Sequence, residues 1–307
     1  MEGNQILLVG LGGLGCSWAT KAWSRCSDHV GFLRIDADDA SLGNIEGAHT
    51  IRLGHVLDDR GCAALPALAE QRMRSLDEAA KPVFDGRELV ILLVGLGGGT
   101  GTGAAAEVAR QARKSGAIVI TVAALPFSLQ SHRTSLANDA LTELESKSHV
   151  CVQLSLDRLA RRSRENGSDW RMGSEWVEDL VEGLVGALLK MGLINLDLMD
   201  LRSIVDLHGA STMIVGTGAS NDADSILKQA TSSPLADFDV SGAKGCLIQI
   251  EGGPDMSISA LNEVADLFTS AVDDDAKVIL GARVSPDLIG QIRVVTLLSG
   301  ISSNFGV

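Results

Sequence analysis

The sequence lacks a surplus of positive charge, and it contains no tyrosine. Its 307 residues include 39 Asp and Glu against 26 Lys and Arg, which gives a formal net charge of -13. Charge of this sign repels a nucleic-acid backbone or an anionic membrane unless a local basic patch overrides it. The one dense basic run, residues 158–164, is typical of a solvated helix face. We therefore expect no nucleic acid among the partners.

Long hydrophobic runs and paired cysteines are also missing. The longest apolar run, residues 117–127, is too short to cross a bilayer, and the N-terminus MEGNQ has no basic targeting region. The five cysteines are odd in number and show no CxxC spacing, and the six histidines show no HxxxH spacing. We therefore expect reduced thiols in a cytoplasmic protein, with no direct membrane segment and no transition-metal site.

In the first half of the chain, apolar segments alternate with segments of helix length. Six segments are rich in Val, Ile and Leu: QILLVG, GFLRID, HTIRLG, ELVILLVG, AIVITVAAL and HVCVQLSL. Strands that are apolar almost throughout are typical of a parallel sheet covered on both faces. The first half is therefore predicted to be a doubly wound, Rossmann-like α/β domain.

A long helical segment follows at residues 173–192. Its apolar residues come in pairs every four positions, and acidic residues fill the other face of its N-terminal half, where the helix dipole favours them. We expect this central helix to lie between two domains. Beyond it, STMIVGTG, GCLIQIEGG, KVILGARV and QIRVVTLLS predict strands, with LNEVADLFTSAV as a helix among them. The predicted domains are residues 1–172 and a smaller α+β C-terminal domain at 193–307.

The first predicted strand runs directly into a glycine loop. Gly10-Leu-Gly12-Gly13-Leu-Gly15 satisfies G-x-G-x-x-G, and Asp36 ends the next strand, as the ribose-binding acid of a dinucleotide site would. A lone match of this kind is equally typical of a turn that only packs a strand against a helix. An NAD-dependent enzyme therefore remains one alternative at this point.

A second glycine loop, LVGLGGGTGTGA at residues 93–104, follows the fourth predicted strand. It lacks the Gly-Lys-Ser/Thr ending of a P-loop, so any anion must be held without that lysine. It also starts a helix, so two sets of backbone amides face the same edge of the sheet. Two such loops, with hydroxyls from Thr100 and Thr102, suit a nucleotide di- or triphosphate accompanied by Mg²⁺.

GGGTGTG is the signature of the tubulin/FtsZ superfamily, and the chain resembles bacterial FtsZ along nearly its whole length. Further matching segments follow in the family's order: PF at 126–127 with Arg133, GLINLDLMDLRSIV from Gly192, TSSPL at 231–235 and DVSGAKGCLIQIEGG from Asp239. The resemblance implies a tubulin/FtsZ-like GTPase that binds GTP or GDP with Mg²⁺ in the domain at 1–172. It also implies a cytoskeletal role in cell division, in which copies of the chain and other FtsZ-like subunits are the partners in a head-to-tail polymer.

The resemblance also implies a set of nucleotide contacts. They are Gly12, Gly13, Gly15, Cys16, Ser17, Asp36, Gly97, Gly98, Gly99, Thr100, Gly101, Thr102, Gly103, Gln130, Arg133, Trp170 and Glu175. Trp170 falls near the family's base-stacking aromatic, although an aromatic packed at the start of a buried helix explains it equally well. Glu175 is placed to accept from the guanine N1 and N2 hydrogens, which favours guanine over adenine.

Asn195, Asp197 and Asp200 resemble the family's catalytic loop, whose acids polarise the water that attacks the γ-phosphate. On the residues alone, Asp-x-x-Asp before a helix is more typical of an N-cap and capping box, and the resemblance reverses that preference. In the family's fold this loop lies at the opposite end of the subunit from the glycine loops. The acids would then act on a neighbour's nucleotide, and a head-to-tail contact of that kind generates an open filament.

The chain departs from the family in and around the nucleotide site. Leu14, Cys16 and Ser17 replace part of the first loop, and Asp36 stands where the family has Asn. Asp58 and Asp59 lie in the third loop, where they would either bind Mg²⁺ or displace the loop from the phosphates. The sequence ends at Val307 without the family's C-terminal tail, through trimming or because this is a divergent member. These departures leave open a nucleotide-binding structural or regulatory protein with little hydrolysis.

Overall fold

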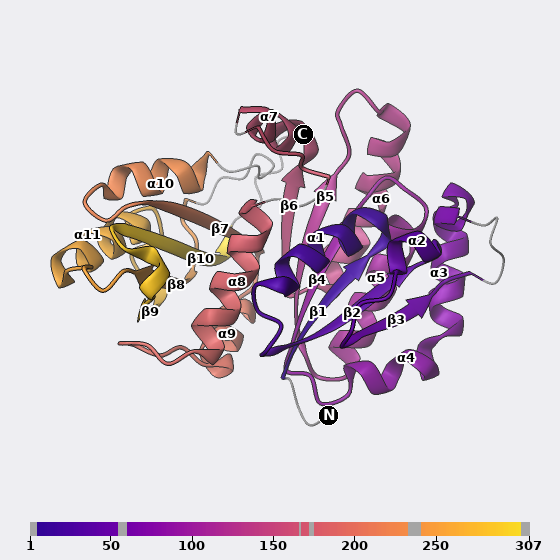
Figure 1. The fold of residues 1–307 in the computed structure, drawn as a ribbon, viewed down its shortest axis with the longest axis horizontal. Helices are drawn as coiled ribbons and strands as arrows, with labels where there is room; N and C mark the ends of the chain where they lie inside the picture. Colours follow the sequence, from indigo (N-terminus) through magenta and orange to yellow (C-terminus); the bar gives the residue numbers. More distant parts are fainter. Residues whose placement is uncertain (1–4, 55–59, 166, 172–174, 233–240, 302–307) are drawn as a thin grey trace. The chain divides into compact units, whose positions relative to one another are not determined.

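The computed structural model describes residues 5–54, 60–165, 167–171, 175–232 and 241–301. Its helices and strands are β1 (Ile6–Leu11), α1 (Gly12–Ser24), β2 (Val30–Asp36), α2 (Asp39–Leu42), β3 (Ala48–Arg52), η1 (Arg60–Ala64), α3 (Pro66–Ser75), α4 (Asp77–Phe84), β4 (Leu89–Gly95), α5 (Thr100–Lys114), β5 (Ile118–Leu125), α6 (Ser131–Lys147), β6 (Val150–Ser155), α7 (Leu156–Glu165), α8 (Glu175–Leu189), α9 (Leu198–Val205), β7 (Ala210–Ala219), α10 (Ala223–Thr231), β8 (Gly245–Gly252), α11 (Ile258–Thr269), β9 (Lys277–Val284), η2 (Pro286–Leu288) and β10 (Gln291–Ile301). The chain separates into two compact units, residues 1–178 and 179–307, which divide within α8 (Figure 1). The domain boundary predicted at 172/173 lies outside the described residues.

The first unit contains a six-stranded parallel sheet in the order β3-β2-β1-β4-β5-β6. Alternate side chains of β1 point to opposite faces of the sheet, because successive side chains of a strand point to opposite sides. Leu7, Val9 and Leu11 join the core formed with α3, α4 and α5, while Ile6 and Leu8 are buried as well. The strands are therefore apolar on both faces, which confirms the predicted doubly wound α/β fold.

Strand order reverses between β1 and β4, the two strands that the glycine loops follow. The connection from β1 to β2 and that from β4 to β5 run in opposite directions along the sheet. Because such crossovers are right-handed, α1 and α5 cover opposite faces (Figure 1). Both helices begin at the carboxyl edge of the sheet, where a switch of this kind leaves a crevice for ligands.

The second unit contains a four-stranded sheet in the order β7-β10-β8-β9, which confirms the predicted smaller α+β domain. β10 is antiparallel to β7 and β8, whereas β8 and β9 are parallel. A buried ion cluster ties this sheet to the C-terminal part of α8. Arg293 contacts Glu251 at 2.7 Å and Glu182 at 3.0 Å, and Arg283 also pairs with Glu251.

The basic run at 158–164 lies in α7, whose buried residues are Leu156, Leu159, Ala160 and Ser163. The arginines on the rest of the helix are half-buried or exposed, as expected of a helix face in contact with solvent. Within the part of the chain that the structure describes, no helix is long and apolar enough to span a membrane.

Candidate nucleotide-phosphate site

A cavity of about 640 Å³ opens at the carboxyl edge of the parallel sheet, between the loops that follow β1 and β4. Its volume is within the range of small-molecule sites. Of the predicted contacts, the cavity is lined by Gly12, Gly13, Asp36, Gly98, Gly99, Thr100, Gly101, Gln130, Arg133 and Trp170. Residues far apart in the sequence therefore line one cavity, as expected if both glycine loops face the same edge of the sheet.

Two helices present their N-termini to this cavity without capping side chains. α1 follows Leu11 and α5 follows Gly99, and neither residue caps its helix through a side chain. Neither helix has an acidic residue in its first turn. The first amides of a helix have no partner within it, and together with the helix dipole they favour an anion.

The positions of the second loop require glycine for different structural reasons. A methyl group on Gly99 would lie 2.1 Å from the carbonyl oxygen of Gly61, and one on Gly103 would lie 1.9 Å from that of Pro66. These positions need glycine because another backbone segment passes against them. Gly98 lines the cavity, and a methyl group there would meet nothing within 4 Å. Gly98 is thus the position at which a side chain would compete directly with a ligand.

Other predicted contacts do not line the cavity: Gly15, Cys16, Ser17, Gly97, Thr102, Gly103 and Glu175. The Cys16 thiol donates to the Gly10 carbonyl at 3.2 Å, and burial, together with the Asp36 charge, raises its pKa to about 12. The Ser17 hydroxyl donates to the Arg171 carbonyl at 2.9 Å. The structure thus gives these two groups partners within the protein, and their contact with nucleotide stays a prediction.

Thr102 and Glu175 also lie away from the cavity lining. The Thr102 hydroxyl accepts from the amide of Gly97 at 2.8 Å and so holds the second loop in shape. Glu175 is exposed at the start of α8. Its predicted role in reading guanine is not tested by this arrangement.

Two aromatic side chains, Phe127 and Trp170, line part of the cavity. The rings of Phe127 and Trp170 meet edge to face with centroids 5.4 Å apart, and the Arg171 guanidinium lies 4.7 Å from the Trp170 ring centre. The indole of Trp18 in α1 donates to the Trp170 carbonyl at 2.9 Å. This hydrogen bond and the one from Ser17 to the Arg171 carbonyl hold the segment that carries Trp170. The Trp170 ring offers a surface on which a base can stack.

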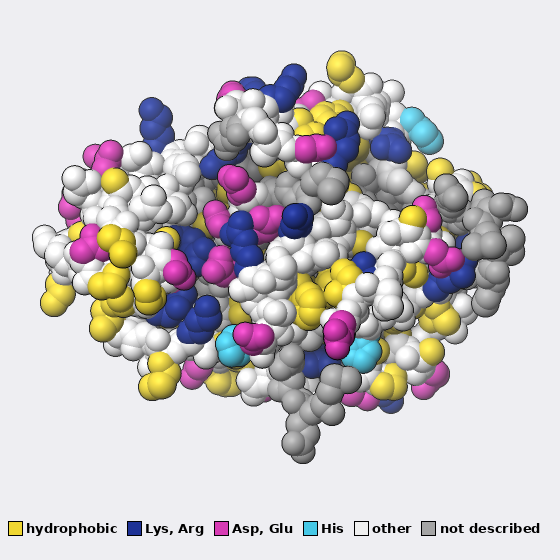
Figure 2. Space-filling model, in the orientation of Figure 1, with side chains coloured by type: hydrophobic (Ala, Val, Ile, Leu, Met, Phe, Trp, Pro, Cys, Tyr) yellow, Lys and Arg dark blue, Asp and Glu magenta, His cyan; other side chains and the backbone are white. Residues whose placement is uncertain are grey.

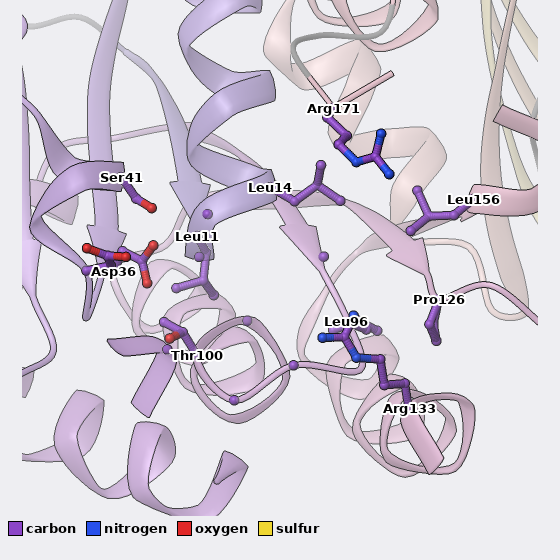
Figure 3. A pocket seen from close by; sticks show the side chains of 18 of the residues that line it. Leu11, Leu14, Asp36, Ser41, Leu96, Thr100, Pro126, Arg133, Leu156 and Arg171 are labelled. Carbon is purple, nitrogen blue, oxygen red and sulfur yellow. The ribbon is translucent and has the colours of Figure 1, made fainter. Parts of the chain in front are cut away.

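The opposite side of the cavity is acidic. Asp36 is only 2% exposed, and its Oδ1 accepts from the amide of Ala37 at 2.7 Å. Burial raises the pKa of Asp36, against the opposing effect of hydrogen bonds that include Ser41 and Thr100. In Figure 3, Asp36, Ser41 and Thr100 lie on one side of the cavity, and Arg133 and Arg171 lie on the other.

Sequence reasoning missed several lining residues, including Asp38, Ser41 and Arg171. Asp38 carries a signal, because it follows a strand and caps α2 by accepting from Ala40. Ser41 carries none. Arg34 donates to the Ser41 carbonyl at 3.3 Å, and only the folded β2–α2 connection places that residue at the cavity.

The predicted catalytic acids lie in the second unit, at the start of α9. Asp197 accepts from the amides of Met199 and Asp200 at 2.8 Å, and Asp200 accepts from the amide of Asp197 at 3.0 Å. This is a capping box. The side-chain oxygen of Asn195 accepts from the amide of Gly192 at 2.7 Å. The catalytic role of these residues stays a prediction, and Asp58 and Asp59 lie outside the described residues.

The fold and the cavity define a doubly wound α/β protein in which two glycine loops border one cavity at the carboxyl edge of the parallel sheet. The comparisons then give the family. The model of the tubulin/FtsZ family GTPase domain matches residues 5–163, and that of the FtsZ family C-terminal domain matches residues 209–302. The chain therefore belongs to the tubulin/FtsZ family, and its N-terminal unit carries the GTPase domain of that family.

The relatives described here are archaeal proteins. Cell division protein FtsZ 1 of Archaeoglobus fulgidus is 31% identical over 303 residues, which cover 97% of this chain and 82% of the relative. Cell division protein FtsZ 2 of Halobacterium salinarum is also 31% identical, with 97% and 77% covered. Among solved structures, the FtsZ dimer of M. jannaschii matches with a TM-score of 0.83 at 26% identity, covering 97% of this chain and 88% of that one. The protofilament of CetZ2 from Haloferax volcanii matches in fold, with a TM-score of 0.79 at 19% identity and 97% and 93% covered.

Proposed function

We propose that this chain is a GTP-binding and GTP-hydrolysing protein of the cell-division cytoskeleton that assembles head to tail into protofilaments. The observation that carries the proposal is the pair of uncapped helix N-termini at one cavity, in a chain of the tubulin/FtsZ family. The relatives named as cell division proteins, and the similar structures described as a dimer and a protofilament, support it.

In this proposal the amides at the start of α1 and α5 hold the phosphates of the nucleotide. Arg133 supplies positive charge, and Trp170 offers a stacking surface for the base. The cavity also carries oxygen donors on Asp36, Asp38, Ser41 and Thr100, which fit a hard cation such as Mg²⁺. Mg²⁺ would neutralise part of the phosphate charge.

The carboxylates of Asp197 and Asp200 would orient the attacking water on the nucleotide of a neighbouring copy. Large apolar side chains are exposed beside them: Met191 is 90% exposed, Leu193 67% and Met199 69%. Several exposed large apolar side chains on one short segment are typical of a protein contact surface. They support a contact between this loop and a second copy of the chain.

A second candidate is a nucleotide-binding structural or regulatory member of the family with little hydrolysis. The capping box favours it, because Asp197 and Asp200 already have a structural role at the start of α9. Family membership leaves the NAD-dependent alternative without support.

The deciding experiment is phosphate release from GTP with Mg²⁺, measured per chain over a range of protein concentrations. We expect a rate near zero at low concentration that rises above a threshold, because the active site is completed by a neighbour. Sedimentation at each concentration shows whether the threshold coincides with polymer. A low rate that does not depend on concentration, with polymer present, would instead support the structural candidate.

A further inference from the structure

The cavity has two chemically different ends. Apolar and aromatic side chains line one of them: Leu14, Leu96, Pro126, Phe127, Leu156 and Trp170. In Figure 3 the labelled members of this group lie on the side away from Asp36 and Ser41. A nucleobase stacks on groups of this kind, whereas phosphates are attracted to the amides at the start of α1 and α5. The base of a bound nucleotide therefore belongs at the apolar end.

The polar side chains at the apolar end are mainly hydrogen-bond donors. Arg133 and Arg171 line it, and a guanidinium has N–H donors but no acceptor. Gln130 also lines the cavity, but an amide carries both a donor and an acceptor and does not discriminate between bases by itself. Among the described lining residues, the carboxylates are Asp36 and Asp38, which belong to the connection between β2 and α2. The apolar end therefore suits a base edge that carries acceptors.

The backbone of Arg171 is held in place, while its side chain extends toward the cavity (Figure 3). Its carbonyl accepts from the Ser17 hydroxyl at 2.9 Å, and its amide donates to Oδ1 of Asp169 at 3.0 Å. The side chain is 68% exposed, and its guanidinium lies 4.7 Å from the Trp170 ring centre. Its ion pair with Asp169, 3.7 Å long, is exposed, and such pairs hold a side chain only weakly. Arg171 can therefore turn its donors to a base that lies beside Trp170.

Guanine and adenine differ at the edge that includes N7. Guanine presents acceptors at O6 and N7, whereas adenine presents an acceptor at N7 beside the donor amino group at N6. A guanidinium matches the guanine pair with parallel N–H groups, but it has no acceptor for the adenine amino group. Glu175, the predicted reader of the guanine N1 and N2 hydrogens, is exposed and does not line the cavity. The described residues thus offer a reader for the O6–N7 edge and, apart from Gln130, none for the N1–N2 edge.

We propose that Arg171 selects guanine over adenine in this chain, by donating to O6 and N7 of a base that lies at the apolar end of the cavity. The proposal rests on the proposed function, because it takes a nucleotide to be the ligand. It differs from recognition by a carboxylate, which accepts from the N1 and N2 hydrogens of guanine. Its particular consequence is that N7 contributes to binding, whereas the 2-amino group does not.

The first test uses the wild-type protein, so that it does not depend on the folding of a variant. The affinities of GDP, IDP, 7-deaza-GDP and ADP are measured by isothermal titration calorimetry with Mg²⁺ present. IDP lacks the 2-amino group but keeps O6 and N7, so it should bind within about threefold of GDP. 7-Deaza-GDP lacks the N7 acceptor and should bind at least about fivefold more weakly than GDP. ADP carries a donor in place of O6 and should bind at least about tenfold more weakly.

The second test assigns the discrimination to Arg171. Arg161→Ala is a matched control, because Arg161 is exposed on α7 and does not line the cavity. Arg171→Ala should reduce the preference for GDP over ADP to about threefold or less, whereas Arg161→Ala should keep the preference of wild type. Arg171→Lys keeps the charge but loses the planar pair of donors, so it should not restore the preference.

Other outcomes overturn the proposal. Weak binding of IDP together with full affinity for 7-deaza-GDP would show that the N1–N2 edge is read instead. An equal loss of GDP and ADP affinity in Arg171→Ala would assign the residue to the phosphates or to the support of Trp170. Equal binding of all four nucleotides by wild type would overturn this proposal and leave nucleotide binding intact. Absence of guanine-nucleotide binding by wild type would refute the proposed function itself.

Discussion

The glycines that follow β4 differ in what a methyl group would meet. Gly99 and Gly103 are pressed against other backbone segments, and Gly101 lies against the carbonyl of Gly95, which a methyl group would approach to 2.2 Å. Gly98 alone among these has free space on the cavity side. One residue type therefore serves packing at some positions of the motif and ligand access at another.

This difference predicts opposite phenotypes for two neighbouring substitutions. Gly99→Ala should lower the free energy of unfolding by about 3 kcal/mol, because the backbone at Gly61 must move. Gly98→Ala should leave stability within about 0.5 kcal/mol, since it lies away from any packed contact, but should weaken GDP binding. Thermal unfolding and GDP titration of both variants check this. Equal loss of stability in the two variants would contradict it.

The helix α9 illustrates how one side chain can have two roles. Asp197 caps it, and the same carboxylate is the predicted water-orienting acid of a neighbouring site. Capping needs an acceptor oxygen, which Asn also has, whereas catalysis needs the negative charge. The two roles can therefore be separated by substitution.

Asp197→Asn should keep the stability of wild type but lower phosphate release above the threshold by about 100-fold or more. Asp197→Ala should lose activity to the same extent and, in addition, about 1 kcal/mol of stability from the cap. GDP affinity should be unchanged in both, because the cavity proposed to bind the nucleotide is lined by residues of the other unit. Wild-type turnover in Asp197→Asn would show that the residue acts only as a cap.

Three helices of the first unit are joined by an ion network around Glu107. This residue of α5 is 4% exposed and is hydrogen-bonded by Arg110, with Arg74 of α3 at 3.6 Å. Arg110 also contacts Asp77 of α4 at 3.0 Å. Burial by itself would raise the pKa of Glu107, but the hydrogen bonds and charge of Arg110, with the charge of Arg74, lower it.

A carboxyl whose pKa is lower in the folded state stabilises the fold above its unfolded pKa, near 4.3 for glutamate. That contribution is lost as the pH falls through the folded value. Glu107→Gln should therefore cost about 2 kcal/mol at pH 7 and should reduce the loss of stability between pH 5 and pH 3. Urea unfolding at several pH values measures both effects. An unchanged acid response in the variant would show that other groups control it.

The elements themselves were largely predictable. Strands such as β4 and β5 are buried in all but their last residue and are apolar apart from Thr121, so their pattern indicates a parallel sheet without tertiary information. The η1 turn was not predictable, because Cys62, Ala63 and Ala64 adopt positive φ angles that non-glycine residues rarely take. The close approach of this turn to α5, where a methyl group on Gly99 would lie 2.1 Å from the Gly61 carbonyl oxygen, likewise depends on the tertiary structure.

For the whole chain, the net charge of -13 opposes close approach of two copies. Figure 2 shows that Asp and Glu side chains lie among the Lys and Arg side chains on the face in view, so positive charge there is interspersed with negative charge. Head-to-tail assembly would therefore depend on short-range contacts, such as those of the exposed Met191 and Met199, more than on long-range attraction.

The sequence by itself determined the fold class, the order of elements and the family, because apolar periodicity and the GGGTGTG motif are local signals. It also indicated that two glycine loops meet, because both follow strands of one parallel sheet. Only the tertiary structure decided which glycines face the cavity and that Ser17 and Thr102 bond within the protein. It also brought Ser41 and Arg171 to the site. Those facts depend on distances between segments far apart in the chain, which no local pattern encodes.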